Sequence, residues 1–181
     1  TQSGLANIAI GDGAGSGQSG SNIAVGDGAG VSQTAINTIA IGTGAGPAQG
    51  TANAIAIGTS AGLVSQAGGI AIGSLTGNTQ GDGVAIGTSA GSTSQSNGAI
   101  ALGNQAGETS QGANSVAIGS LAGQNSQTAG SVIINASGIA LDSTTAGFYV
   151  SPVRDGTTDS GTKRDLQINT VTNEISYKTL G

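Results

Sequence analysis

Three short glycine-rich segments are the places where residue types and spacing could support ligand chemistry. Gly15-Ser-Gly-Gln-Ser-Gly20 matches the pattern whose glycines let a backbone approach a dinucleotide pyrophosphate, but it lacks the buried strand, following helix and distant acidic residue of a real site. Gly11-Asp-Gly-Ala-Gly15 and Gly26-Asp-Gly-Ala-Gly30 have the spacing of calcium-binding turns. Only these two equivalent turns carry Asp, so ordinary turn chemistry is favoured and no cofactor or metal site is predicted.

Five C-terminal carboxylates are the remaining candidates for catalysis, because a pair of them could hydrolyse a polysaccharide. A solvated surface with ion pairs to nearby Arg and Lys is favoured instead. The chain has no Cys or His, which excludes thiolate and imidazole chemistry. We therefore expect no catalytic residue and no enzyme; the carboxylates are Asp142, Asp155, Asp159, Asp165 and Glu174.

Composition also excludes several partners. The 181 residues include 35 Gly, and nine acidic residues against four basic ones give a net charge of −5. The chain therefore has no basic patch for nucleic acid. No apolar run approaches the ~18 residues of a membrane helix, so no membrane insertion is expected. Thr1 follows no signal segment, which suggests a mature or trimmed chain.

A four-residue phrase of the type Ile-Ala-Ile-Gly recurs through most of the chain. Its closing glycines are 14 to 16 residues apart, and Val132-Ile-Ile-Asn135 is a degenerate ninth copy. A second glycine follows each of the eight regular copies by four residues. This period is too short for helical repeats and suits one coil of a β-solenoid. The closing glycines are Gly11, Gly26, Gly42, Gly58, Gly73, Gly87, Gly103 and Gly119.

The sequence thus predicts an all-β protein, a parallel β-solenoid or β-roll of about nine coils of 14–16 residues. Side chains alternate along a strand, and we expect the first and third residues of each phrase to point inward. The alanine before the second glycine, such as Ala29, closes the core from the other side. The free energy gained by burying these side chains within one chain is then too small to offset the conformational entropy lost when each coil is ordered. Further surface must therefore be buried between chains.

The central alanine of each phrase is the expected contact, since it never varies among the eight copies. This stripe is predicted to point outward and to form the interchain seam of a homo-oligomer. The alternative is a monomer in which alanine recurs only because it is a small residue that suits the strand. The predicted seam is Ala9, Ala24, Ala40, Ala56, Ala71, Ala85, Ala101 and Ala117.

A glutamine follows each closing glycine by seven or eight residues. Stacked glutamines can hydrogen-bond from coil to coil as an amide ladder, which is favoured over ligand binding. The predicted ladder is Gln18, Gln33, Gln49, Gln66, Gln80, Gln95, Gln111 and Gln127.

Composition changes near Asp142, which predicts solenoid repeats over 1–141 and a C-terminal cap or docking module over 142–181. All four basic residues and all three aromatic residues lie in the second part. Residues 166–177 read as two short strands, a β-hairpin. Phe148, Tyr149 and Tyr177 are expected to cover the last coil, and the N-terminal face is expected to stay open.

The phrases Asn22-Ile-Ala-Val-Gly26 and Asn114-Ser-Val-Ala-Ile-Gly119 resemble the head repeats of YadA-like trimeric autotransporter adhesins. The resemblance covers about residues 5 to 135 and implies a left-handed parallel β-roll assembled as a trimer on a bacterial surface. The segments Gly147-Phe-Tyr-Val-Ser-Pro-Val-Arg154 and Asn173-Glu-Ile-Ser-Tyr177 resemble those that end fibre proteins of phages and large DNA viruses.

Together these features predict a non-enzymatic structural protein: an adhesive extracellular filament or cell-surface fibre, trimeric and able to polymerise head to tail. The alternative is a receptor-binding phage or viral tail fibre, located on a virion, whose ligand is a host-surface glycan. A fibre-borne polysaccharide hydrolase is a more distant alternative.

Overall fold

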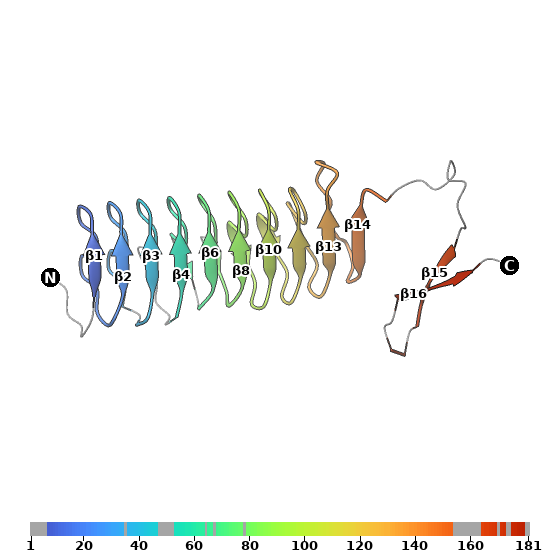
Figure 1. Ribbon diagram of the computed structural model, residues 1–181, viewed down its shortest axis with the longest axis horizontal. Coiled ribbons are helices and arrows are strands. Elements are labelled where there is room, and N and C mark those ends of the chain that lie inside the picture. Colours follow the sequence, from blue (N-terminus) through green and yellow to red (C-terminus); the bar gives the residue numbers. More distant parts are fainter. Residues whose placement is uncertain are drawn as a thin grey trace.

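The fold is a parallel β-solenoid, seen in a computed structural model (Figure 1). The structure describes residues 7–34, 36–46, 53–63, 65–66, 68–77, 79–153, 164–169, 171–172 and 175–179. Within these ranges all regular elements are β-strands. The predicted all-β parallel roll is therefore confirmed.

The main sheet has ten parallel strands, one from each successive coil. Equivalent residues lie beside one another, as in the pairing of Ala101 with Ala85 and Ala117. In order, the strands are β1 (Ile8–Ile10), β2 (Ile23–Val25), β3 (Ile39–Ile41), β4 (Ile55–Ile57), β6 (Ile70–Ile72), β8 (Val84–Ile86), β10 (Ile100–Leu102), β12 (Val116–Ile118), β13 (Val132–Asn135) and β14 (Phe148–Ser151).

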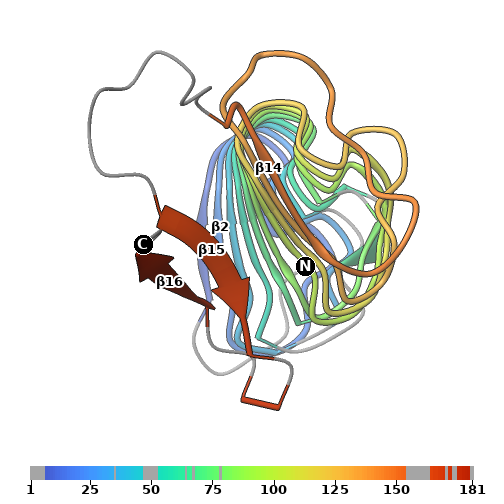
Figure 2. The same ribbon diagram turned by 90° about the vertical axis from the view of Figure 1, so that its right-hand side faces the viewer.

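A second parallel sheet forms where the chain reaches the glutamine row. It contains β5 (Ser65–Gln66), β7 (Thr79–Gln80), β9 (Thr93–Gln95) and β11 (Thr109–Gln111). Gln111 pairs with Gln95, and an isolated bridge continues the register to Gln127. Viewed along the solenoid, the coils lie behind one another with nearly the same outline (Figure 2).

The closing glycine of each phrase turns the corner after the main strand. Gly103 has φ +134, a backbone conformation that L side chains rarely adopt. A Cβ placed there would lie 2.7 Å from the backbone C and O atoms of Gly119 in the next coil. Glycine is thus required both by the turn and by the close stacking of successive corners.

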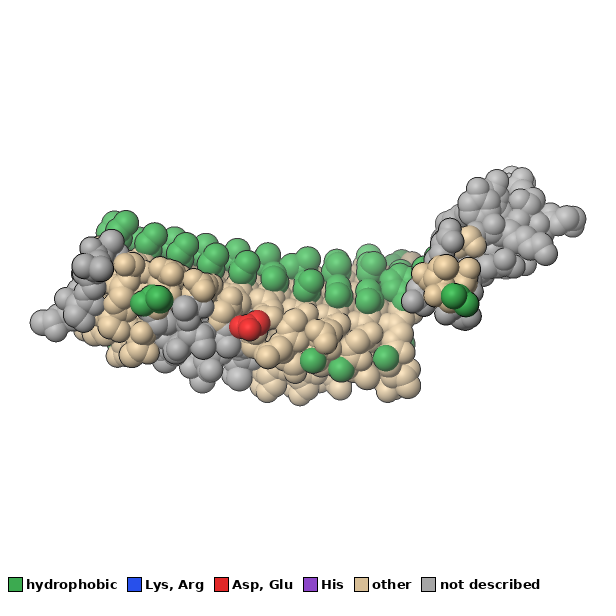
Figure 3. All heavy atoms as spheres, turned by 90° about the horizontal axis from the view of Figure 1, so that it is seen from below, with side chains coloured by type: hydrophobic (Ala, Val, Ile, Leu, Met, Phe, Trp, Pro, Cys, Tyr) green, Lys and Arg blue, Asp and Glu red, His purple; other side chains and the backbone are tan. Residues whose placement is uncertain are grey.

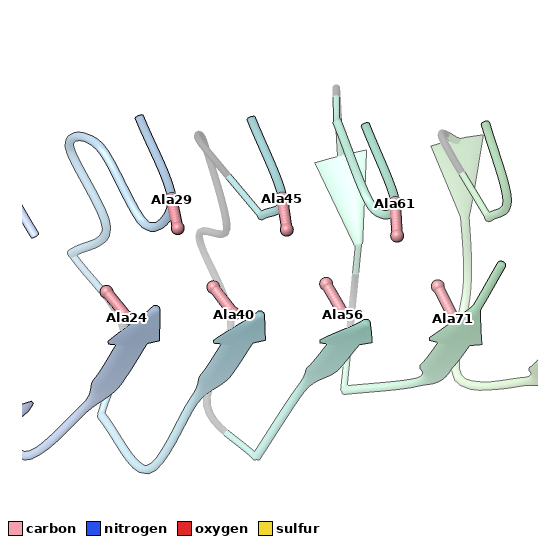
Figure 4. Close-up of a cluster of buried hydrophobic side chains, with 7 residues drawn as sticks. All are labelled: Ala24, Ala29, Ala40, Ala45, Ala56, Ala61 and Ala71. Atoms are coloured by element: carbon pink, nitrogen blue, oxygen red, sulfur yellow. The ribbon is translucent and has the colours of Figure 1, made fainter. Parts of the chain in front are cut away.

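The interior of the coil is narrow and lined by alanine. The central alanines of β2, β3, β4 and β6 point toward those that precede the second glycines (Figure 4). Ala24, Ala40, Ala56 and Ala71 are all 0% exposed, and Ala29 is equally buried. The predicted second wall of the core is therefore present.

The prediction that the central alanines point outward and form the interchain seam is wrong. Seven of these alanines have no exposed surface within a single chain: Ala24, Ala40, Ala56, Ala71, Ala85, Ala101 and Ala117. The exception is Ala9, which is exposed and belongs to the first described coil. The physical reason is that the two walls of a regular coil lie close together and meet through one alanine methyl group from each side. The larger first and third side chains must therefore point outward.

The main sheet continues beyond residue 141, where the sequence predicts the end of the repeats. β14 pairs in parallel with β13, so Phe148 and Tyr149 belong to the tenth strand of the solenoid. The predicted hairpin is present as antiparallel β15 (Arg164–Ile168) and β16 (Ile175–Thr179). The change of composition near Asp142 therefore precedes the end of the parallel sheet.

Candidate assembly surface

The outer face of the main sheet carries two unbroken columns of large apolar side chains. They alternate with the buried central residues of the ten strands, and we call them together the aliphatic face. The first column is Ile8, Ile23, Ile39, Ile55, Ile70, Val84, Ile100, Val116, Val132 and Phe148; the second is Ile10, Val25, Ile41, Ile57, Ile72, Ile86, Leu102, Ile118, Ile134 and Val150.

These side chains are accessible along the whole length of the solenoid. Figure 3 shows hydrophobic side chains as a continuous band along one side of the molecule. Ile10 is 62% exposed at the first coil, Ile86 is 39% exposed in the middle and Val150 is 43% exposed at the last strand. A continuous apolar surface of this kind is typical of an interaction site.

No charged side chain interrupts the aliphatic face, because both positions of every strand are apolar. Each column advances by one strand spacing, about 4.8 Å, per coil. The surface is therefore apolar throughout and repeats regularly with the coils.

A row of glutamine side chains lies inside the coil. Gln95 Nε2 donates to Gln111 Oε1 at 3.0 Å, and Gln111 Nε2 donates to Gln127 Oε1 at 3.1 Å. Gln18 Nε2 donates to Gln33 Oε1 at 2.8 Å. The five described glutamine side chains are at most 3% exposed, so the ladder is an internal structural element rather than a ligand site.

The remaining predicted rungs lie outside what the structure describes. Gln49 lies outside the described residues, and the side chains of Gln66 and Gln80 are likewise not described. Their backbones pair in register, Gln66 with Gln80 and Gln80 with Gln95. The backbone positions of Gln66 and Gln80 are thus those that the ladder requires.

The predicted cap residues have three different placements. Tyr149 occupies the inward position of β14, packs against the alanine cluster and donates its hydroxyl to the Thr145 carbonyl oxygen at 3.0 Å. Phe148 is 59% exposed and belongs to the aliphatic face. The side chain of Tyr177 lies outside the described part of the chain. Tyr149 alone is therefore seen to cover the end of the core.

The glycine-rich segments that the sequence offered as ligand sites form turns of the solenoid. Gly15, Gly17 and Gly20 adopt positive φ in turns, and Gln18 between them belongs to the ladder. Asp12 and Asp27 are exposed on neighbouring coils, and no cluster of three metal-ligating side chains occurs among the described residues. Asn135-Ala-Ser137 has the pattern of an N-glycosylation acceptor. Asn135 is 2% exposed, however, and its Nδ2 donates to the carbonyl oxygens of Ser120 and Ile139.

The aliphatic face is the candidate assembly surface that the sequence interpretation missed. The signal was present, because alanines occupy both walls of the coil at facing positions, Ala24 opposite Ala29 in the first full coil. Two facing alanines indicate a narrow interior in the regular coils, and isoleucine takes the inward position only at Ile133 in the degenerate ninth copy. The same strands must then display their large residues on the outside.

No protein family model, curated protein or solved structure matches this chain. The described part of the chain contains no helix that is long and apolar enough to span a membrane. The geometry of the solenoid and of its aliphatic face is therefore what indicates a function.

Proposed function

We propose that this chain is a non-enzymatic structural protein that forms a segment of an extracellular fibre by association of its aliphatic faces. The observation that supports the proposal is the pair of apolar columns, which continue without interruption over the ten strands of the main sheet. Repeated coils give the molecule length, and the columns give every coil the same lateral contact.

Apolar burial supplies the free energy of this association. Completing the burial of one half-exposed Ile contributes roughly 1 kcal/mol, and each coil presents two such side chains. The contributions accumulate along the rod because the surface repeats with the strand spacing. Lateral association of identical chains in register is thus favoured more strongly as the solenoid lengthens.

A trimer is the assembly proposed, since the repeats resemble the heads of YadA-like adhesins. In a threefold arrangement the aliphatic faces of three chains meet around a common axis, and each face is covered by its two neighbours. The alanine seam predicted from the sequence is replaced by this isoleucine and valine seam, with the alanines inside each coil.

Paired charge substitutions on one coil test the seam. Ile86 belongs to the aliphatic face, whereas Thr88 is exposed just beyond the corner glycine of the same coil. Ile86→Glu should reduce the mass measured by sedimentation to that of one chain, because carboxylates from several chains would be buried together. Thr88→Glu should keep the mass of the wild-type trimer. A monomeric wild type, or a trimer that survives Ile86→Glu, would contradict the proposal.

Adhesion is the proposed task of the fibre, and a phage or viral receptor-binding fibre is the alternative. A glycan array probed with the purified protein separates recognition from a purely mechanical role. Reproducible binding that disappears when residues 164–179 are replaced by a neutral linker would favour a receptor-binding fibre. Absence of binding with an intact trimer would favour a scaffold.

A further inference from the structure

The aliphatic face changes character at its C-terminal end. Nine strands contribute Ile or Val to its first column, whereas β14 contributes Phe148, the one aromatic residue on the face. Phe148 is 59% exposed. The two residues before it in the column are the smaller Val116 and Val132. The column therefore ends in a large side chain that occurs at one level only.

The strand that carries Phe148 is held in place from inside the coil. β14 pairs in parallel with β13, with Phe148 beside Val132. Tyr149 packs against the alanine cluster, and its hydroxyl donates to the Thr145 carbonyl oxygen at 3.0 Å. Because successive side chains alternate across a strand, the inward Tyr149 keeps Phe148 on the outer face. Phe148 thus occupies a defined position on the aliphatic face.

The rest of the face specifies the axial position of a partner only weakly. Each main-sheet strand from β1 to β13 presents two aliphatic side chains, and these levels repeat with a strand spacing of about 4.8 Å. A partner displaced by one coil would still meet Ile, Val or Leu at most levels. A repeating surface of this kind needs a separate feature that disfavours the displaced pairings. Along this face, a side chain that occurs at only one level meets that need.

The aliphatic face is large enough for a stable contact with a second copy of this chain. Its partly exposed side chains present on the order of 1,000 Å², and a stable interface buries about 800 Å² on each partner. A second copy supplies an apolar surface with the same coil spacing, and neither copy brings a charged residue to it. The contact can therefore extend along the whole face to Phe148.

We propose that Phe148 fixes the axial register of the laterally associated chains, which rests on the association of aliphatic faces proposed above. In register, the Phe148 rings of neighbouring copies meet at one level, where aromatic contacts are more favourable than their area alone predicts. After displacement by one coil, the Phe148 of one copy lies at the level of Val132, and that of the other extends beyond the column into water. Only the in-register assembly buries every Phe148 ring.

Methyl NMR of the full chain tests the register, because identical chains related by symmetry give one signal for each isoleucine δ-methyl group. A copy displaced along the axis is no longer equivalent to its neighbours, so the signals split. Ile100 is a sensitive reporter, since displacement by one coil places Val84 or Val116 at its level. Sedimentation of the same samples gives the number of associated chains.

Phe148→Val makes the last level of the column equal to the one before it, where Val132 stands. The mass should stay that of the wild type, while the ratio of displaced to in-register Ile100 signals should rise about tenfold. Phe148→Ile, which introduces the commonest residue of the column, is the second variant if Phe148→Val does not fold. Ile139→Val is the matched control. Ile139 is 73% exposed but lies in the loop after β13, outside both columns, so its substitution should leave one set of signals.

A single set of Ile100 signals in Phe148→Val at the wild-type mass would overturn the proposed role of Phe148 and leave the aliphatic seam intact. Loss of the oligomer in that variant would also overturn it, because Phe148 would then hold the chains together rather than align them. Split signals in the wild type would overturn it directly. A wild type that sediments as one chain would refute the seam itself, and the register with it.

Discussion

At the scale of single residues, the solenoid depends on how little space lies inside one coil. A Cβ placed on Gly30 would lie 3.0 Å from Ala24 Cβ and 2.5 Å from Gln18 Nε2. The interior is therefore filled by alanine methyl groups and glutamine amides, with glycine wherever the backbone approaches them. The sequence shows little variation at these positions because each neighbouring coil imposes the same limit.

Enlarging a central alanine should destabilise the protein although valine favours strands. Ala101 is 0% exposed, and Ala101→Val should lower the free energy of unfolding by about 1–3 kcal/mol through overpacking. Ile100→Val, on the outer face of the same strand, should change it by less than about 1 kcal/mol. Denaturant titration below the association concentration measures both values. Equal losses of unfolding free energy for the two variants would contradict the inward orientation of Ala101 and the outward orientation of Ile100.

Corner glycines should be less replaceable than other glycines with positive φ. Gly103→Ala should destabilise by about 3 kcal/mol, because strain adds to the overlap with the Gly119 backbone. Gly130 has φ +69 and nothing within 4 Å of an added Cβ, so Gly130→Ala should cost only about 1 kcal/mol. Thermal unfolding compares the two variants. The prediction fails if Gly130→Ala is the more harmful change.

At the scale of elements, the glutamine ladder links the two walls of the coil to the next coil. Gln111 accepts from Gln95, and its Nε2 donates to Gln127 and to the carbonyl oxygen of Ile100. One side chain thus connects β9, β11 and β10. The ladder gives a narrow alanine core the polar cohesion that its small apolar surface does not provide.

Removing one rung should therefore weaken the solenoid more than removing an outer glutamine. Gln111→Leu leaves buried partners unsatisfied and should cost about 2 kcal/mol. Gln105→Leu is the matched control, because Leu75 and Leu121 occupy the equivalent position with similar positive φ. We expect less than about 0.5 kcal/mol for Gln105→Leu in chemical denaturation. Similar losses for the two variants would argue against a structural ladder.

At the scale of the whole molecule, polarity is separated by face. The aliphatic face occupies one side of the rod, while the position after each corner glycine carries Asp, Thr, Ser or Asn, as at Asp27 and Thr59. Association is expected through the side that has no charge.

The oligomer should therefore be insensitive to ionic strength. Raising NaCl from 0.1 to 1 M shortens the Debye length from about 10 to 3 Å and weakens contacts between charges. An aliphatic seam has none to weaken, so the mass measured by light scattering should stay constant. Dissociation at high salt would show that another, charged surface holds the chains together.

The sequence by itself determined the period, the strand positions, the corner glycines, the glutamine row and the C-terminal hairpin. Each of these is a local pattern that repeats, and the stacking of identical coils converts it directly into columns. It did not determine which side of Ile-Ala-Ile faces inward, because the alternation of the phrase is symmetrical about Ala and allows both orientations. Only the tertiary structure decided this, through the short distance between facing walls such as Ala24 and Ala29. Because this distance buries the alanines, the candidate seam consists of the outward Ile and Val side chains. The tertiary structure also showed that Phe148 belongs to the solenoid, since its strand pairs with β13.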